Sequence, residues 1–311
     1  MQTDLTTRHH FRQAPVVVNA RYSLTRSQTD LVFALLTELK LEDDDFKDYT
    51  LTKKQLEVKL GVRLDTTQLR NTAKGLMSKI IEFVNDEEDW ELLTWFSYFA
   101  YKKGVITYRF DKSMKPYLLQ LKQFVSADIR HIVQMKSEYS KRVYMLIKER
   151  QKFGVRKFDV EELMEQLEVP KSFRVYSEFK KKVLMQSVKD INKFTDIEIK
   201  NIGTSKKPIY FEEYKPSRKI IAVTFHFKKN LADLKQFISW IRELYVNEPL
   251  YEGKDGHMLK CSEKGLLYYA DDAMEWLDEK TAQKSWEWLH ENREKLYCFQ
   301  PSLLDYAEET V

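Results

Sequence analysis

The spacing of apolar residues repeats itself along the chain at a constant shift. Residues 52–62 read TKKQLEVKLGV and residues 159–169 read DVEELMEQLEV, and both segments follow a capping residue with leucines four positions apart on one helix face. The register continues without a gap into the next helix, where the same shift aligns Leu69, Leu76, Met77 and Ile81 with Tyr176, Val183, Leu184 and Val188. A repeat that covers two helices and the turn between them predicts two helix-turn-helix modules in one chain.

The pattern around the first module predicts a winged helix, in which three helices precede a β-hairpin. The apolar period changes from helical spacing to two in residues 90–101 and 105–110, so these segments should pair as strands. Lys102, Lys103 and Gly104 then form a basic hairpin tip. The other expected elements are a strand or arm at 15–20, a helix at 24–40, a strand at 49–51, a helix from Thr52 to Gly61, and a helix from Thr66 or Thr67 to about Val84.

The second module follows a connecting stretch, residues 111–134, with a short helix at 115–122. It is expected to consist of a helix at 135–152, a strand at 157–158, a helix at 160–167, a turn at 170–172, a recognition helix at 173–194, and a wing built from 196–202, 209–214 and 220–227. The pattern therefore predicts an α+β protein with tandem winged helices at 15–130 and 131–230. A mainly helical extension is expected at 231–311, with helices at 237–245 and 282–296 and a turn and helix at 264–279.

Charge is distributed unevenly along the 311 residues. Residues 131–230 contain 23 basic and 13 acidic residues, a net charge of +10, whereas residues 1–130 carry +2 and residues 231–311 carry −8. Lysine and arginine contacts to phosphates supply most non-specific affinity for duplex DNA, so the middle block predicts a DNA-binding module. The alternative is that these charges are solvated helix faces. The negative charge of the extension would keep it away from DNA.

Polar residues on the expected recognition helix are candidates for DNA contact. The N-terminal part of such a helix meets base edges and its later turns lie nearer the backbone, which favours Arg174, Ser177 and Lys181 as groove contacts. Lys182 lies on the flank, and Lys180 is close enough to the apolar face to reach only a phosphate. The expected wing adds basic residues near its turns, namely Lys206, Lys207 and Arg218.

Four longer segments resemble one known family, the iteron-binding plasmid replication initiators of the RepE-like group. They are LTRSQTDLVFALL in the first helix, PYLLQLKQFVSADI at 116–129, SEYSKRVYMLIKE at 137–149 and VLMQSVKDINKFTDI at 183–197. The resemblance covers residues 15–230 in the order that the family has.

The resemblance implies two winged helices with different tasks. The second is the main reader of repeated origin sequences, through Arg174, Ser177, Lys180, Lys181 and Lys182. The first adds DNA contacts in the monomer and forms the interface of a repressor homodimer. Its equivalent helix carries Arg70 and Lys74, where the basic content is thinner.

Other functional classes find little support in the sequence. No G-x-x-x-x-G-K-[ST] run is present, and adjacent His9 and His10 do not have the alternate spacing of a nickase metal site, so no enzyme, cofactor or metal is expected. Cys261 and Cys298 lie far apart, which suits a reducing cytoplasm and gives no zinc spacing. No segment has the length and hydropathy of a leader or membrane span, so no membrane partner is expected.

Three interpretations remain open at the level of sequence. The first is an initiator that binds direct repeats at a plasmid origin, helps to open the duplex, recruits the host initiator or helicase, and represses its own operator as a dimer. The second is a dimeric repressor that binds inverted half-sites and has no initiator role. The third is a scaffold whose basic block contacts acidic proteins. The extension is either a helical cap that packs its tryptophans on the second winged helix or a docking module for a replication partner.

Overall fold

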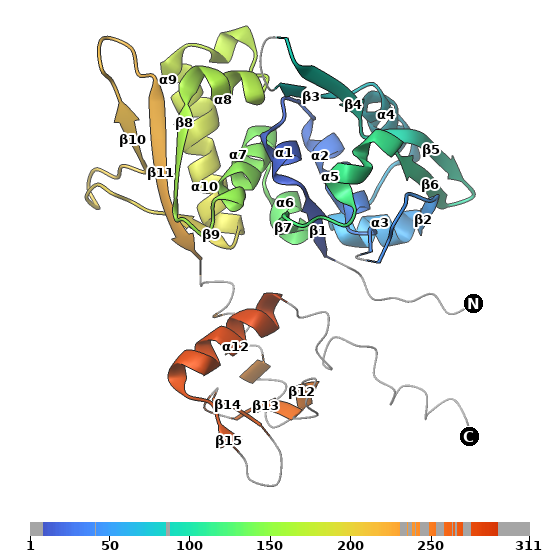
Figure 1. The fold of residues 1–311 in the computed structure, drawn as a ribbon, viewed down its shortest axis with the longest axis vertical. Coiled ribbons are helices and arrows are strands. Elements are labelled where there is room, and N and C mark those ends of the chain that lie inside the picture. Colours follow the sequence, from blue (N-terminus) through green and yellow to red (C-terminus); the bar gives the residue numbers. More distant parts are fainter. Residues whose placement is uncertain are drawn as a thin grey trace. The chain divides into compact units, whose positions relative to one another are not determined.

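The computed structural model describes residues 9–40, 42–84 and 88–230, and from the C-terminal part residues 235, 238–239, 241–242, 249–252, 258–262, 264, 266–269 and 275–291. The chain divides into two compact units, and the first, His9–Lys229, contains both winged helices (Figure 1). The described residues after Lys229 belong to the second unit. Each unit is treated by itself below.

The N-terminal winged helix begins with strand β1 (His10–Gln13) and two helices, α1 (Pro15–Asn19) and α2 (Arg26–Leu36). The expectation of a strand or arm at 15–20 is wrong, because Pro15 in the first turn suits the start of a helix, and Val17 and Val18 are buried. Helix α2 starts at a capping box in which the Thr25 side chain and the Gln28 side chain each bind the other residue's backbone amide.

The helix-turn-helix of this module follows the expected boundaries closely at its start. Strand β2 (Tyr49–Thr52) leads into α3 (Lys53–Leu60), which Thr52 caps and Gly61 ends with a left-handed φ of 65°. Helix α4 (Thr66–Met77) is capped by Asp65. The expected continuation of this helix to Val84 is wrong: β3 (Ile80–Val84) is a strand whose alternate residues Ile81 and Phe83 are buried.

Two small sheets complete the module. Strand β3 pairs with β4 (Trp90–Thr94), and β2, β6 (Val105–Phe110) and β5 (Phe96–Lys102) form a three-stranded sheet in the order β2-β6-β5. The single strand expected at 90–101 is therefore divided at Trp95, whose side chain is fully buried. The hairpin between β5 and β6 is confirmed, and Lys103 and Gly104 take the positive φ values of a tight turn.

The connecting stretch is more structured than expected. It contains η1 (Lys112–Met114), α5 (Lys115–Leu118), β7 (Val125–Asp128), which pairs with β1, and α6 (Ile129–Gln134). The short helix expected at 115–122 thus ends four residues early.

The C-terminal winged helix has the expected order of elements. Its helices are α7 (Glu138–Glu149), α8 (Val160–Gln166), the 3₁₀ turn η2 (Lys171–Phe173), and a recognition helix composed of α9 (Tyr176–Phe179), the π-helical segment η3 (Lys180–Leu184) and α10 (Met185–Phe194). Its strands are β8 (Val155–Asp159), β9 (Ile197–Ile199), β10 (Phe211–Tyr214) and β11 (Ala222–Lys229). Strand β11 pairs with all three of the others, so the wing is built around it.

Helix α7 belongs to the core of both winged helices. Every residue from Ser140 to Ile147 is buried, so the helix has no solvent face over more than two turns. It packs against α10 of its own module and against α1, α2 and β7 of the N-terminal module (Figure 1). One continuous hydrophobic core consequently runs through the whole first unit.

The second unit contains a four-stranded antiparallel sheet in its described part. The strands β12 (Pro249–Glu252), β13 (Met258–Cys261), β14 (Leu267–Tyr269) and β15 (Glu275–Trp276) pair in sequence order, and α12 (Glu279–Glu291) follows them. A mainly helical extension is therefore wrong for this part, and so is the helix expected over 264–279. Trp286 and Leu289 on α12 are buried with Ile241 and Leu267 in a core of the unit's own. The helix expected at 282–296 is confirmed as far as Glu291, and most of 237–245 lies outside the described residues.

Candidate nucleic-acid interface

The recognition helix presents its predicted apolar face to the core. Phe179, Val183, Leu184, Val188 and Ile191 are all buried. The π-helical segment widens the helix at Lys180–Leu184, and Met185 donates its backbone N–H to the Lys180 carbonyl. Such single π-turns often occur at functional sites, because they add a residue to one turn without breaking the helix.

The exposed side of this helix carries basic residues that no acid neutralises in the described part of the chain. Lys181, Lys182 and Lys189 are exposed, and none of them has an ion pair there. Ser177 is exposed one turn earlier. Arg174 stands just before the helix, not on it, because the helix begins at Tyr176 instead of Phe173. Arg174 is exposed, and its Nε lies 3.5 Å from the carbonyl oxygen of Val169.

Lys180 differs from the other predicted DNA-contacting lysines because it is paired inside the module. Its Nζ lies 2.8 Å from the Glu213 carboxylate on β10 and 5.6 Å from the centre of the Phe211 ring. Tyr176 also donates its hydroxyl to Glu213. Partial burial acts to raise the pKa of Glu213, but the hydrogen bonds from Lys180 and Tyr176 outweigh it and lower that pKa. Lys180 thus joins the recognition helix to the wing.

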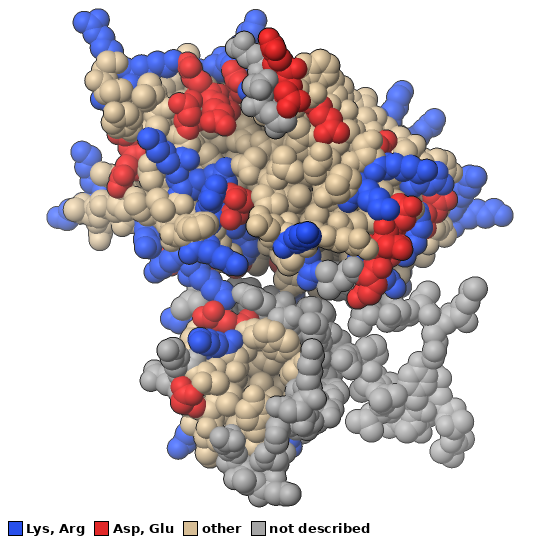
Figure 2. All heavy atoms as spheres, in the orientation of Figure 1, with Lys and Arg blue, Asp and Glu red and all other residues tan. Residues whose placement is uncertain are grey.

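The wing has two basic loops. Lys206 and Lys207 are exposed in the loop between β9 and β10, which the Asn201 side chain orders by accepting the amide N–H groups of Gly203 and Ile209, both at 3.0 Å. Arg218 is exposed in the loop between β10 and β11. Figure 2 shows Lys and Arg side chains over the part of the molecule where Figure 1 places β9, β10 and β11, with Asp and Glu side chains near α8.

The N-terminal module supplies four more of the predicted residues. Arg70 and Lys74 are exposed one turn apart on α4, a helix without acidic residues. Lys102 and Lys103 are exposed at the tip of the β5–β6 hairpin. These positions correspond to the recognition helix and wing of the second module. The structure therefore places all twelve predicted residues on or beside recognition helices and wings, and Lys180 among them pairs with Glu213.

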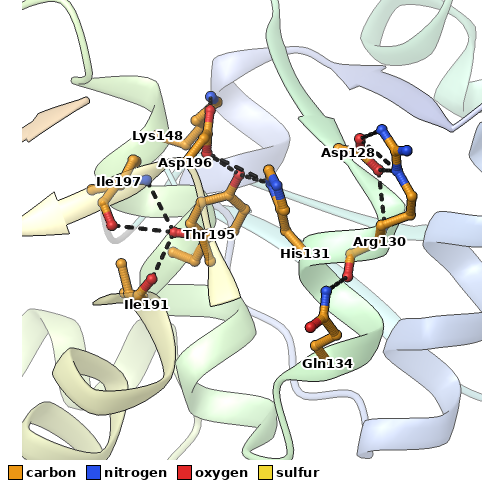
Figure 3. A network of polar contacts seen from close by, with 10 residues as sticks. Asp128, Arg130, His131, Gln134, Lys148, Ile191, Thr195, Asp196 and Ile197 are labelled. Atoms are coloured by element: carbon orange, nitrogen blue, oxygen red, sulfur yellow. Dashed lines mark hydrogen bonds and ion pairs between the residues drawn. The ribbon is translucent and has the colours of Figure 1, made fainter. Parts of the chain in front are cut away.

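The far end of the recognition helix is fixed by a polar network (Figure 3). Thr195 donates its hydroxyl to the Ile191 carbonyl at 2.9 Å and accepts the Ile197 amide at 3.1 Å. Asp196 accepts hydrogen bonds from Lys148 and, at 2.8 Å, from the Tyr144 hydroxyl, both on α7. His131 of α6 places its Nδ1 3.7 Å from the same carboxylate. The helix that carries the basic face is therefore held against α6 and α7.

A second set of polar contacts joins the two winged helices. The fully buried guanidinium of Arg142 on α7 donates to the carbonyls of Val18 at 3.2 Å and Ala20 at 2.7 Å, and lies 3.6 Å from the centre of the Tyr22 ring. Lys141 on the same helix pairs with Asp30 on α2. Because these groups are buried, they fix the orientation of one module relative to the other more firmly than surface ion pairs would.

Sequence reasoning did not find these positioning residues, nor Lys136, an exposed lysine directly before the Ser137 cap of α7. The sequence does contain a signal for the positioning residues of α7. It is a run of three polar residues within an otherwise apolar stretch of that helix, Ser140, Lys141 and Arg142. Among the described residues, no group of three or more His, Cys, Asp or Glu side chains is placed to hold a metal ion. No helix in the described part is both long and apolar enough to span a membrane.

Fold and charge together define a class, that of tandem winged-helix proteins with a basic second module. Two family profiles match the sequence, one described as "Initiator Replication protein, WH1" over residues 10–148 and one as "Initiator Rep protein, WH2" over residues 159–227. They span about two thirds of the chain together. The chain belongs to this family of replication initiators, which confirms the resemblance seen in its sequence.

Individual relatives are distant. A replication initiation protein of Escherichia coli is 23% identical over 192 residues, which cover 58% of this chain and 61% of that protein's length. The crystal structure of Pi initiator protein in complex with iteron DNA matches with a TM-score of 0.55 and 19% identity, over 72% of this chain and 98% of the other. This likeness supports the shared fold. Domains 2 and 3 of RctB match over 73% of this chain and 94% of the other, with a TM-score of only 0.40 and 9% identity.

Proposed function

We propose that this protein is a plasmid replication initiator that binds directly repeated duplex sequences at an origin. The observation that carries the proposal is the basic face of the recognition helix, where Lys181, Lys182 and Lys189 are exposed and unpaired among the described residues. Unpaired lysines on a recognition helix are what binding to phosphates requires, because each neutralised phosphate releases counterions. Membership of the initiator family and the fold shared with an iteron-bound initiator support the choice of origin DNA as partner.

The twelve predicted residues divide into three groups under this proposal. Arg174, Ser177 and Lys181, at the leading end of the recognition helix, would contact bases, and the arginine fork can donate two hydrogen bonds to guanine. The remaining residues of the second module, and those of the first, would contact phosphates and set the position of the protein on the duplex. They are Lys182, Lys206, Lys207 and Arg218 in the second module, and Arg70, Lys74, Lys102 and Lys103 in the first. Lys180 would act indirectly, through Glu213.

A dimeric repressor without an initiator role is the second candidate, and one surface favours the homodimer that both candidates include. The β3–β4 hairpin exposes Ile80, Val84, Trp90 and Leu92, with Val84 opposite Trp90 in the register. An exposed cluster of large apolar residues on a short two-stranded sheet is typical of an interaction surface. Opening of the neighbouring duplex and recruitment of a host initiator or helicase in the cytoplasm complete the proposal. The second unit is the candidate docking module, since its helix α12 packs Trp286 into a core formed within that unit.

Selection of binding sites from random duplex DNA tests the proposal. The full-length chain is used at near-physiological salt, and the enriched sequence is searched for beside the gene. Enrichment of a motif of about two helical turns that recurs there as direct repeats supports the initiator. A palindrome would favour the repressor, and a chain that prefers no duplex at all would be the scaffold.

A further inference from the structure

A groove of about 470 Å³ lies between the start of α7 and the recognition helix. Lys136 and Ser137 line it on one side, and Lys181, Lys182 and Lys189 line it on the other. The segment η3 packs directly against α7, and the Tyr139 and Phe173 rings meet edge to face at 6.1 Å between their centres. The two walls are therefore held together by packing contacts, so the groove is a fixed feature of the folded module.

Four lysines in one groove give it an unusually strong positive charge. Lys136, Lys181, Lys182 and Lys189 are all exposed, and no acidic residue pairs with any of them in the described part of the chain. Glu138 is the acidic residue of the lining, which leaves a formal excess of three positive charges. Some other lysines of the module do have acidic partners: Lys180 pairs with Glu213, Lys219 with Glu161 and Lys228 with Glu198. The groove brings together four lysines that have no ion pair among the described residues.

Two neutral polar side chains of the groove each make a hydrogen bond within the module. The Ser137 hydroxyl accepts the Ser140 amide at 3.3 Å, and Gln186 donates its side-chain amide to Asp190 at 2.9 Å. Each therefore has less hydrogen-bonding capacity left for a ligand. The positive charge of the groove lies on ammonium groups, which act as point charges without the fixed fork by which arginine distinguishes bases. The chemistry of the groove is that of a phosphate site.

We infer that this groove binds the phosphates of one DNA strand, so that α7 holds the backbone beside the recognition helix. The inference rests on the proposed function and changes it in one respect. Lys181, which the sequence favours as a groove contact, becomes a phosphate contact together with Lys136 and Lys189, and base reading is left to the leading end of the helix at Arg174 and Ser177. Phosphate contacts on both sides of a reading helix fix its register without carrying sequence information.

The test compares the full-length protein with Lys136→Gln, Lys189→Gln and the double variant. Lys193→Gln is the matched control, because Lys193 is exposed on the same helix α10 but does not line the groove. Fluorescence anisotropy gives the affinity for a selected site and for a random duplex between about 50 and 200 mM salt. Thermal unfolding of each variant verifies the fold, which removal of exposed lysines leaves intact.

The double variant is expected to lose the same factor in affinity on both duplexes. The slope of log K against log salt should become shallower by up to about two, one for each lost phosphate contact. The Lys193→Gln control should keep the slope of the unaltered protein.

Three other results would overturn the inference. A double variant that behaves like Lys193→Gln would show that the groove carries no phosphate. Loss confined to the selected site would mean that these lysines read bases. If the unaltered protein shows no salt-dependent binding to any duplex, the proposed function itself fails, and the inference fails with it.

Discussion

Removal of the Asp196 carboxylate should lower the stability of the protein by an amount that can be worked out from its contacts. It receives hydrogen bonds from Lys148 and Tyr144 and lies 3.7 Å from His131, at the point where the recognition helix ends. Only 17% of the Asp196 side chain and 14% of the Lys148 side chain are exposed. Asp196→Asn would remove the negative charge with little change in shape.

The expected loss of unfolding free energy follows from these exposed fractions. Removing one partner of a buried ion pair costs about 3 to 5 kcal/mol, and the residual exposure places this pair near the lower limit, at about 3 kcal/mol. For a domain of about 150 to 250 residues, that corresponds to a decrease of roughly 6 to 12 °C in Tm. Asp48→Asn is the control. Its carboxylate lies 2.7 Å from the Arg109 guanidinium, but 47% of the Asp48 side chain and 44% of the Arg109 side chain are exposed, so the loss should stay below about 1 kcal/mol.

The effect must also depend on pH. Burial acts to raise the pKa of Asp196, but Lys148, His131 and Tyr144 outweigh it, and the pKa is lowered below its ordinary value. A carboxyl with a lowered folded-state pKa contributes stability above its unfolded pKa of about 4, and this contribution is lost as the pH falls towards the folded value. The difference in unfolding free energy between the protein and Asp196→Asn should therefore be largest near neutral pH and shrink below about pH 4.

Urea unfolding at several pH values measures this difference directly. A double variant, Asp196→Asn with Lys148→Met, should recover part of the loss, because neither residue then leaves an unpaired charge. An Asp196→Asn variant within about 0.5 kcal/mol of the unaltered protein, or a difference that stays constant down to pH 3, would refute the reasoning.

The remaining predictions concern DNA contact and the second unit. Arg174→Ala should cost about 1 to 3 kcal/mol of discrimination between a selected site and random duplex, whereas Lys206→Ala should weaken both equally and lower the salt slope by about one; anisotropy titrations distinguish the two, and equal losses for Arg174→Ala would contradict its role. Gly203→Ala should lower both DNA affinity and Tm, because an added Cβ would lie 2.4 Å from the Lys207 carbonyl and displace the wing loop. Affinity unchanged by this substitution would show that the loop does not touch DNA. Leu289→Ala should destabilise the second unit by about 2 to 5 kcal/mol, since Leu289 is fully buried in its core. Hydrogen exchange should show the loss there, and protection lost instead within His9–Lys229 would contradict two separate cores.

Features that depend on neighbours in the sequence were predictable. Thr52 caps α3 and Gly61 ends it because a side-chain cap and a left-handed residue act within one turn. The β5–β6 hairpin was predictable for the same reason, since its two-residue turn and alternating strands are local signals.

Features that depend on residues far away in the sequence could not be predicted. Residues 80–84 have apolar positions compatible with a helix or a strand, and their pairing with β4 decides between the two. The strands of the second unit were mistaken for a helix because β14 and β15 are too short to show alternation. The sequence also does not show which lysines remain free to bind DNA. Lys180, for example, pairs with Glu213, a residue 33 positions away on another element.

The burial of α7 on every side has a consequence for how such initiators diverge. A winged helix whose core is formed only by its own residues could be exchanged between proteins, and the exchange would give a new origin specificity. Here the helix that supports the recognition helix also fills the core of the N-terminal module, through Lys141, Arg142 and the apolar residues around them. A chimaera joined on either side of α7 would leave one module without a core helix or force two unrelated surfaces together. New repeat specificity in this architecture is therefore accessible through single changes on the exposed side of the recognition helix, and not through exchange of the module.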